Sequence, residues 1–210
     1  MAHDIALDDL ERDALTEVVN IGVSRAAASL RKMVGRQVLL SVPAVEIVTH
    51  KAAAALIGQR ESEDLVAVKQ DFDGAFSGRA LLIFPETRSM ELVRAVAGDD
   101  IPAEDLPELE SEALSETGNV ILNNCLGTMA NMLQRSLTMS LPEVLHGRGE
   151  DLFVNAQGED GGLVLFLYIN FSVRDRNIRG YIAMLMDLPS LATLKVLIAD
   201  FIARVTADAG

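Results

Sequence analysis

The sequence of 210 residues has no tryptophan, one cysteine and three histidines, and aromatic residues make up only 4% of it. A single cysteine, Cys125, cannot form a disulfide within the chain, which is typical of a reducing compartment. We interpret Cys125 as a small buried apolar residue. The histidines His3, His50 and His146 lie far apart, with no other ligand residues at metal-binding spacing. The sequence therefore predicts no metal and no cofactor of its own.

Basic residues are also scarce, because 18 Lys and Arg stand against 31 Asp and Glu, for a net charge of −13. This charge argues against nucleic acids and anionic membranes as partners. No apolar run approaches the roughly 18 residues of a membrane-spanning helix, so membrane insertion is not predicted. Residues 1–12 carry several acidic side chains, unlike a signal peptide. We therefore expect a cytoplasmic protein.

What the sequence does contain is one motif written twice. Residues 13–20 read DALTEVVN and residues 112–119 read EALSETGN, so each copy consists of an acid, Ala, Leu, a hydroxyl residue, Glu, two further residues and Asn. A proline follows each Asn at the same interval, Pro43 after Asn20 and Pro142 after Asn119. The Glu, the Asn and the proline all recur at an offset of 99 positions. Such constant spacing indicates a duplicated unit.

Both copies lie in segments whose apolar residues recur with the helical period, so the Glu and the Asn of each copy share one helix face. The first acid of each copy lies four residues before the Glu, on the same face. A solvated helix face is the plain alternative. Asn is a poor residue for a helix interior, however, and like charges at this spacing are mildly destabilising. The mid-helix Asn and the pair of like charges are each unfavourable, yet they occur in both copies. This suggests that the two copies have the same function. The two stripes are Asp13, Glu17 and Asn20 in the first copy, and Glu112, Glu116 and Asn119 in the second.

An amide and a carboxylate offer limited but specific chemistry. A carboxamide has two donors and one acceptor, so it can hold a water molecule in a chosen orientation. A Glu can accept a proton or pair with a lysine of a partner. In phosphoryl transfer, an amide can position the attacking water while a metal ion and a lysine on the other component manage the charge. We therefore expect each stripe to be a half-site that completes an active site on another protein.

The pattern Asp/Ser-x3-Glu-x2-Asn-x22-Pro, present twice, resembles the CheC phosphatases of bacterial and archaeal chemotaxis, relatives of CheX and FliY. The resemblance covers essentially the whole chain. It implies removal of the phosphoryl group from the aspartyl phosphate of a CheY-like response-regulator receiver domain. It further implies that Asn20 and Asn119 orient the attacking water, and that Glu17 and Glu116 pair with the active-site lysine of the regulator.

The first acidic residue of the motif matches the family pattern in one copy and departs from it in the other. Asp13 matches the first position of the family pattern, whereas Glu112 stands where Asp or Ser is usual. We expect both to be binding residues at the rim. Any Mg²⁺ would belong to the partner regulator. The resemblance leaves two other functions open, a non-catalytic adaptor that binds a CheD-like deamidase and a flagellar switch component. The chain has no segment left over for an additional switch domain, which ranks the last of these lowest.

The order of elements repeats along with the motif. Helices are predicted over 7–33, 51–57, 87–97, 109–133 and 190–205, the second ended by Gly58. Strands are predicted over 38–48, 65–68, 75–84, 137–145, 163–173 and 178–186, the first broken at Pro43. Turns are expected around Asp73-Gly74 and near 175–177, and a loop over 151–162.

These elements predict an α/β layered fold of two helix–strand–strand–strand–helix units with pseudo-twofold symmetry. The units would share one mostly antiparallel sheet, with the long motif helices packed together on one face. We expect a single CheC-like domain over residues 1–210, built from repeats at about 8–98 and 107–207.

Overall fold

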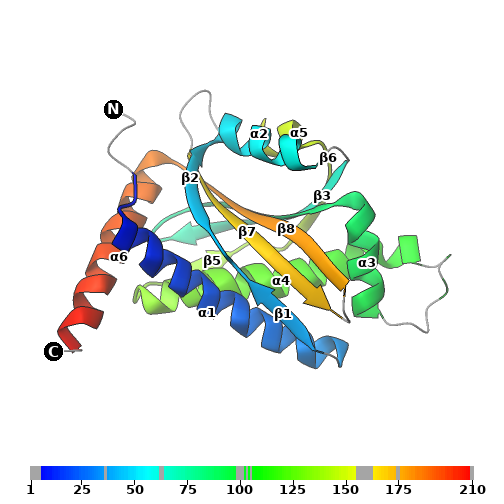
Figure 1. Cartoon of the computed structure of the whole chain (residues 1–210), viewed down its shortest axis with the longest axis horizontal. Helices are drawn as coiled ribbons and strands as arrows, with labels where there is room; N and C mark the ends of the chain where they lie inside the picture. The colour runs from blue at the N-terminus through cyan, green and yellow to red at the C-terminus, as the bar shows by residue number, and fades with distance from the viewer. Residues whose placement is uncertain are drawn as a thin grey trace.

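The computed structural model describes residues 6–35, 37–61, 64–97, 102, 104, 106–154, 163–173 and 176–208. Their order of elements repeats once (Figure 1). The first half contains α1 (Asp9–Val34), β1 (Val38–Ser41), β2 (Val45–Thr49), α2 (His50–Arg60), β3 (Leu65–Gly74), β4 (Gly78–Pro85) and α3 (Glu86–Ala97). The second contains α4 (Leu106–Met132), β5 (Leu137–Met139), β6 (Glu143–Gly147), α5 (Gly149–Val154), β7 (Leu163–Val173), β8 (Arg176–Met186) and α6 (Leu188–Asp208).

The two halves exchange strands to build one antiparallel sheet. Strands β1 and β2 of the first half pair with β7 of the second, while β5 and β6 of the second pair with β3 of the first. Strands β4 and β8 pair with each other at the centre, and each also forms a hairpin within its own half. Because every strand pair across the halves has its counterpart, the two units share one sheet with the predicted pseudo-twofold arrangement.

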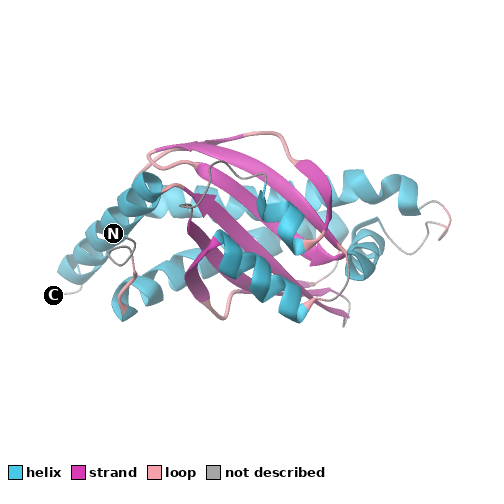
Figure 2. Ribbon diagram, turned by 90° about the horizontal axis from the view of Figure 1, so that it is seen from above, coloured by secondary structure: helices cyan, strands magenta, loops and turns pink. Residues whose placement is uncertain are grey.

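Helices cover both faces of the sheet. The long helices α1 and α4 lie side by side on one face, together with α3 and α6, and α2 and α5 lie on the other (Figures 1 and 2). The strands between them alternate between two apolar clusters. In β7, Leu165 and Leu167 belong to the cluster under α1 and α4, and Val164 and Phe166 to the cluster under α2 and α5. Because both sides are buried, these strands read as unbroken apolar runs in the sequence.

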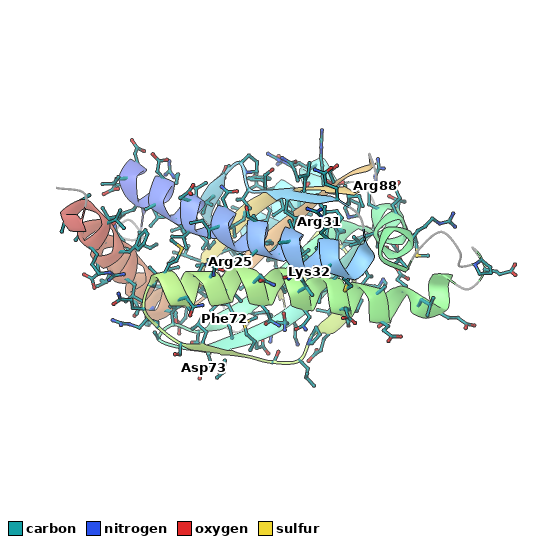
Figure 3. All side chains as sticks on the ribbon, turned by 90° about the horizontal axis from the view of Figure 1, so that it is seen from below. Arg25, Arg31, Lys32, Phe72, Asp73 and Arg88 are labelled. Carbon is teal, nitrogen blue, oxygen red and sulfur yellow. The ribbon has the colours of Figure 1, made fainter. Side chains whose placement is uncertain are left out.

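The helices α1 and α4 run antiparallel (Figure 3), and they are in close contact at Gly22. A Cβ placed on Gly22 would lie 2.9 Å from the Cα of Cys125, so only glycine fits there without moving a helix. Cys125 is fully buried, and burial raises the pKa of its thiol to about 12. Gly118 likewise faces Val68 of β3, whose side chain would lie 2.5 Å from an added Cβ. Both glycines next to the motif asparagines therefore serve close packing.

The fold class follows the prediction, and the differences are local. Each half has four strands and three helices, because the strand that crosses the proline is two strands and a short helix follows the second of them, as predicted for the first half only. The helix predicted to end at Gly58 continues to Arg60, since its backbone there needs no positive φ. The turn predicted at Asp73-Gly74 follows those residues, because β3 extends through Gly74 to pair with β5.

The second half contains a helix that the sequence reading missed. Residues Gly149–Val154, which overlap the start of the predicted loop, form α5, where Leu152 and Phe153 are buried in the cluster under α2. Residues 155–162 of that loop, and positions 174–175 at the predicted turn between β7 and β8, lie outside the described residues. Among the described helices, none is long and apolar enough to cross a membrane. Nor do the described His, Cys, Asp and Glu side chains form a group of three or more that could hold a metal ion.

Candidate functional site

The helix that carries the first motif is fixed at both ends. Asp8 is the N-cap, and its side chain accepts a hydrogen bond of 2.8 Å from the Glu11 backbone N–H. Glu11 in turn accepts a bond of 2.9 Å from the Asp8 N–H, which completes a capping box. At the other end Gly35 adopts the left-handed conformation, with φ of 65°, that glycine tolerates best. The motif residues therefore stand on a well-terminated helix.

Both predicted stripes face outward. In each, the two acidic side chains are exposed and the asparagine is half-buried. The exposed acids are Asp13 and Glu17 on α1, and Glu112 and Glu116 on α4. Each asparagine is half-buried, so neither is sealed in the interior. Because the two helices are antiparallel, the stripes lie on opposite sides of the crossing at Gly22.

The Asn20 amide is bonded to the backbone of one residue. Its Nδ2 donates to the Val42 carbonyl oxygen at 3.0 Å, and its Oδ1 accepts from the Val42 N–H at 2.9 Å. A backbone N–H can only donate, so this pair fixes which end of the amide is oxygen. Val42 immediately precedes Pro43, between β1 and β2. The constant spacing from Asn to Pro therefore has a physical basis, because the amide fastens the chain where the proline breaks the strand.

The second half reaches the equivalent segment by a different route. The Asn119 Oδ1 accepts from Gln70 Nε2 at 3.1 Å and from Asn123 Nδ2 at 2.6 Å. Gln70 Nε2 also donates to the Ser140 carbonyl oxygen at 2.9 Å, two residues before Pro142. The Asn119 amide is thus tied to its proline segment through Gln70 instead of directly. Both halves therefore connect the asparagine to the segment before the proline, but they do so through different hydrogen bonds.

An open pocket of about 370 Å³ runs along the first stripe. It adds to the site a cation, Arg25, whose guanidinium also donates to Thr128 Oγ1 of α4 at 3.3 Å. In the second copy, the position 99 residues later holds Asn124, which is neutral. The first stripe therefore combines an acid, an amide and a cation. The pocket is lined by Glu17, Asn20, Ile21, Ser24, Arg25 and Ala28.

Several of these neighbours do not stand out in the sequence. Val42 and Arg25 belong to no repeated pattern in the sequence. Their place beside the motif residues is evident only from the structure. Asn123 lies four residues from Asn119 on α4, and its amide donates to the Asn119 Oδ1. Gln70 had the clearest signal, since it is a polar residue that alternates with the apolar residues Val68 and Phe72 along β3.

The bond from Asn20 to Val42 predicts a stability effect. Replacing Asn20 by alanine leaves the N–H and the carbonyl of Val42, a residue only 2% exposed, without their partner. We expect the free energy of unfolding to fall by about 1–3 kcal/mol, as for other buried backbone groups that lose a partner. Urea unfolding followed by circular dichroism measures this. The matched variant Asn131→Ala, at an exposed position of α4, should change the value by less than about 0.5 kcal/mol. Equal effects in both variants would contradict a role for the Val42 contact.

Comparison with known proteins gives consistent matches. The profile of the CheC-like family matches residues 10–47, which include the first stripe and Pro43. The CheY-P phosphatase CheC of Bacillus subtilis is 25% identical over 194 residues, covering 89% of this chain and 92% of CheC. The flagellar motor switch phosphatase FliY of the same organism is 24% identical over 140 residues, covering 66% of this chain and 36% of FliY.

Comparison of the three-dimensional structure finds a similar protein. The crystal structure of Thermotoga maritima FliY superimposes with a TM-score of 0.74 at 16% sequence identity, covering 93% of this chain and 98% of that one. This likeness concerns the fold, a curled antiparallel sheet with helices packed on it. Sequence and fold comparisons therefore agree on one group of proteins.

Proposed function

We propose that the chain is a CheC-like phosphatase that hydrolyses the aspartyl phosphate of a CheY-like receiver domain, because the CheC-like profile matches residues 10–47 and CheC of Bacillus subtilis is similar over 89% of this chain. The observation that carries this proposal is the pair of outward-facing stripes, each with an exposed Glu one helical turn from an accessible amide of fixed orientation. The name of the B. subtilis relative, CheY-P phosphatase, supports the same substrate.

In the proposed reaction the chain supplies no nucleophile. Water attacks the phosphorus in line with the bond to the aspartyl oxygen, that bond breaks, and the aspartate carboxylate and inorganic phosphate are released. Asn20 or Asn119 holds the water in the attacking orientation, which is the kind of contact that stabilises the transition state more than the ground state. Mg²⁺ and a lysine of the receiver balance the charge on the phosphoryl group.

The acidic residues of each stripe have the complementary role of binding. Glu17 and Glu116 are placed to pair with a lysine at the edge of the phosphorylated site, and Asp13 and Glu112 extend each acidic surface by one turn. The exposed position of all four suits steering of a partner by long-range attraction, which salt weakens. The chain thus provides orientation and docking, while the receiver provides the charged reaction centre.

The proposal is tested by phosphate release. Candidate receivers, phosphorylated with a small phosphodonor in the presence of Mg²⁺, are mixed with the purified chain, and inorganic phosphate is followed over time. We expect release at least about tenfold faster than from the receiver alone, since positioned water typically contributes factors of this size or more. If no CheY-like receiver loses its phosphoryl group faster in the presence of the chain, the proposal is wrong.

A further inference from the structure

Gln70 occupies a position that the rest of the sheet fills with apolar side chains. On β3 the side chains directed at α1 and α4 include Val66, Val68 and Phe72, all buried and apolar, and Gln70 stands among them with none of its surface exposed. Its Oε1 has no hydrogen-bond partner among the described residues. A buried amide with an unpaired oxygen is less stable there than an apolar side chain of the same size. Gln70 therefore calls for an explanation other than packing.

The other half of the sheet has an apolar residue at the corresponding place. Val144 of β6 is opposite Val68, and Val45 of β2, which is 99 positions before Val144, is opposite Leu167. Val68 and Leu167 are therefore equivalent, and two residues further along each strand Gln70 corresponds to Ile169. The polar side chain is thus specific to the half-site of Asn119.

The contacts of Gln70 determine what the Asn119 amide can offer. The Ser140 carbonyl can only accept, so the end of Gln70 that faces it is the nitrogen, and this nitrogen also faces Asn119. The Asn119 atom at that contact must be its oxygen. Asn123 Nδ2 donates to the same oxygen, so both lone pairs of the Asn119 Oδ1 are occupied. Only the two N–H groups of Asn119 remain for a partner.

The Asn20 amide keeps a different set of groups. Val42 occupies one hydrogen of its Nδ2 and one lone pair of its Oδ1, which leaves one donor and one acceptor. A water molecule that attacks phosphorus directs its own lone pair at the phosphorus and its hydrogens at acceptors. The Asn20 amide can accept such a hydrogen, whereas the Asn119 amide as bonded cannot. The pocket with Arg25 also lies on the Asn20 side.

We propose that Gln70 is a positioning residue that makes the two half-sites unequal. By occupying the oxygen of Asn119, it leaves Asn119 as a donor suited to a phosphoryl or carboxylate oxygen, and it leaves Asn20 as the amide that orients the attacking water. This inference rests on the proposed function. It adds that most of the turnover comes from the half-site on α1.

The test uses the full chain with one or two substitutions and a phosphorylated receiver. With only the Asn20 site left, Asn119→Ala should retain most of the wild-type kcat. With only the Asn119 site left, Asn20→Ala should lose about tenfold in kcat with KM changed less than about twofold, because the lost contact acts in the transition state. Equal kcat in the two single variants, or a larger loss in Asn119→Ala, would overturn the inference while leaving the proposed function intact. Absence of turnover in the wild type would instead reject the proposed function.

Gln70→Met gives a result that loss of structure could not produce. Methionine keeps the length of the side chain but cannot donate, so one lone pair of the Asn119 oxygen is released. In the Asn20→Ala background we expect this substitution to raise kcat by about threefold or more, and in the Asn119→Ala background to leave it unchanged. The matched control is Ile169→Met at the equivalent position, which should alter neither. An unchanged or lower kcat for Gln70→Met in folded Asn20→Ala protein would contradict the role of Gln70.

A measurement on the folded protein tests the contact without relying on turnover. In ¹⁵N-labelled wild-type chain the side-chain amide of Gln70 should be protected from hydrogen exchange, because Nε2 is buried and donates twice. Its resonances should shift in Asn119→Ala and stay in place in Asn20→Ala. The inference fails if the Gln70 amide exchanges freely, or if its resonances do not shift in Asn119→Ala. This holds even when the Gln70→Met chain does not fold.

Discussion

Replacement of both Asn20 and Asn119 by alanine is expected to reduce phosphate release to the rate of the phosphorylated receiver alone. The physical reason is that in the proposed mechanism the receiver supplies the charged reaction centre, so water orientation would be the main chemical contribution of this chain. Removing a contact made mainly in the transition state lowers kcat far more than binding. We expect at least about a hundredfold loss of the accelerated rate, as for other groups that position reactants.

Binding of the receiver should survive in the double variant. The exposed acids Glu17 and Glu116 remain, so the dissociation constant, measured by fluorescence anisotropy of a labelled receiver, should change by less than about threefold. Asn131→Ala, at an exposed position of α4 away from the stripes, controls for the loss of a surface amide. Because Asn20→Ala removes the tie to Val42, circular dichroism at the assay temperature must show a folded chain. Normal turnover in a folded double variant would refute the proposed mechanism.

The sequence alone predicted much of the architecture because the duplication repeats local signals. The helical period around Asn20 and Asn119 predicted α1 and α4, and closely spaced β-branched and other apolar residues predicted most strands. It also indicated a pseudo-symmetric sheet with the long helices on one face. The exchange of strands between halves could not be derived in the same way, because the pairing of β3 with β6 depends on contacts far apart in the sequence. The short helix α5 was missed for a related reason, since it is stabilised by packing against α2.

The candidate site was predictable only in its repeated part. Two copies of Glu and Asn at one spacing indicated that the two stripes matter, and both stripes lie at the surface as expected. What holds each amide was hidden, because Val42 and Gln70 come from other elements. Gln70 has no polar counterpart in the other half. A comparison of the two halves, which reveals the repeated motif, therefore does not reveal Gln70. A chemical difference between half-sites requires the three-dimensional contacts.

Substitution of Gly22 by alanine is expected to lower the free energy of unfolding by about 1 kcal/mol or more. Alanine is intrinsically favoured over glycine in a helix by about 1 kcal/mol, so the local effect alone would be stabilising. The added Cβ, however, would lie 2.9 Å from the Cys125 Cα and 3.2 Å from the Asn124 carbonyl oxygen. These are backbone atoms of α4 that cannot rotate away, so α1 and α4 must separate, and overpacking of this kind costs about 1–3 kcal/mol or more. Whether Gly22→Ala raises or lowers the free energy of unfolding is therefore decided by how closely α1 and α4 pack at Gly22.

Gly127→Ala on α4 is the matched control for this prediction. A Cβ at Gly127 would meet nothing within 4 Å, so only the helix propensity changes. We expect the free energy of unfolding to rise by about 0.5–1 kcal/mol, opposite in sign to Gly22→Ala. Urea unfolding with a constant slope measures both values. If Gly22→Ala stabilises the chain as Gly127→Ala does, the helices do not meet at Gly22. Because Asn20 and Asn119 lie on either side of that contact, the spacing of the two half-sites would then need another explanation.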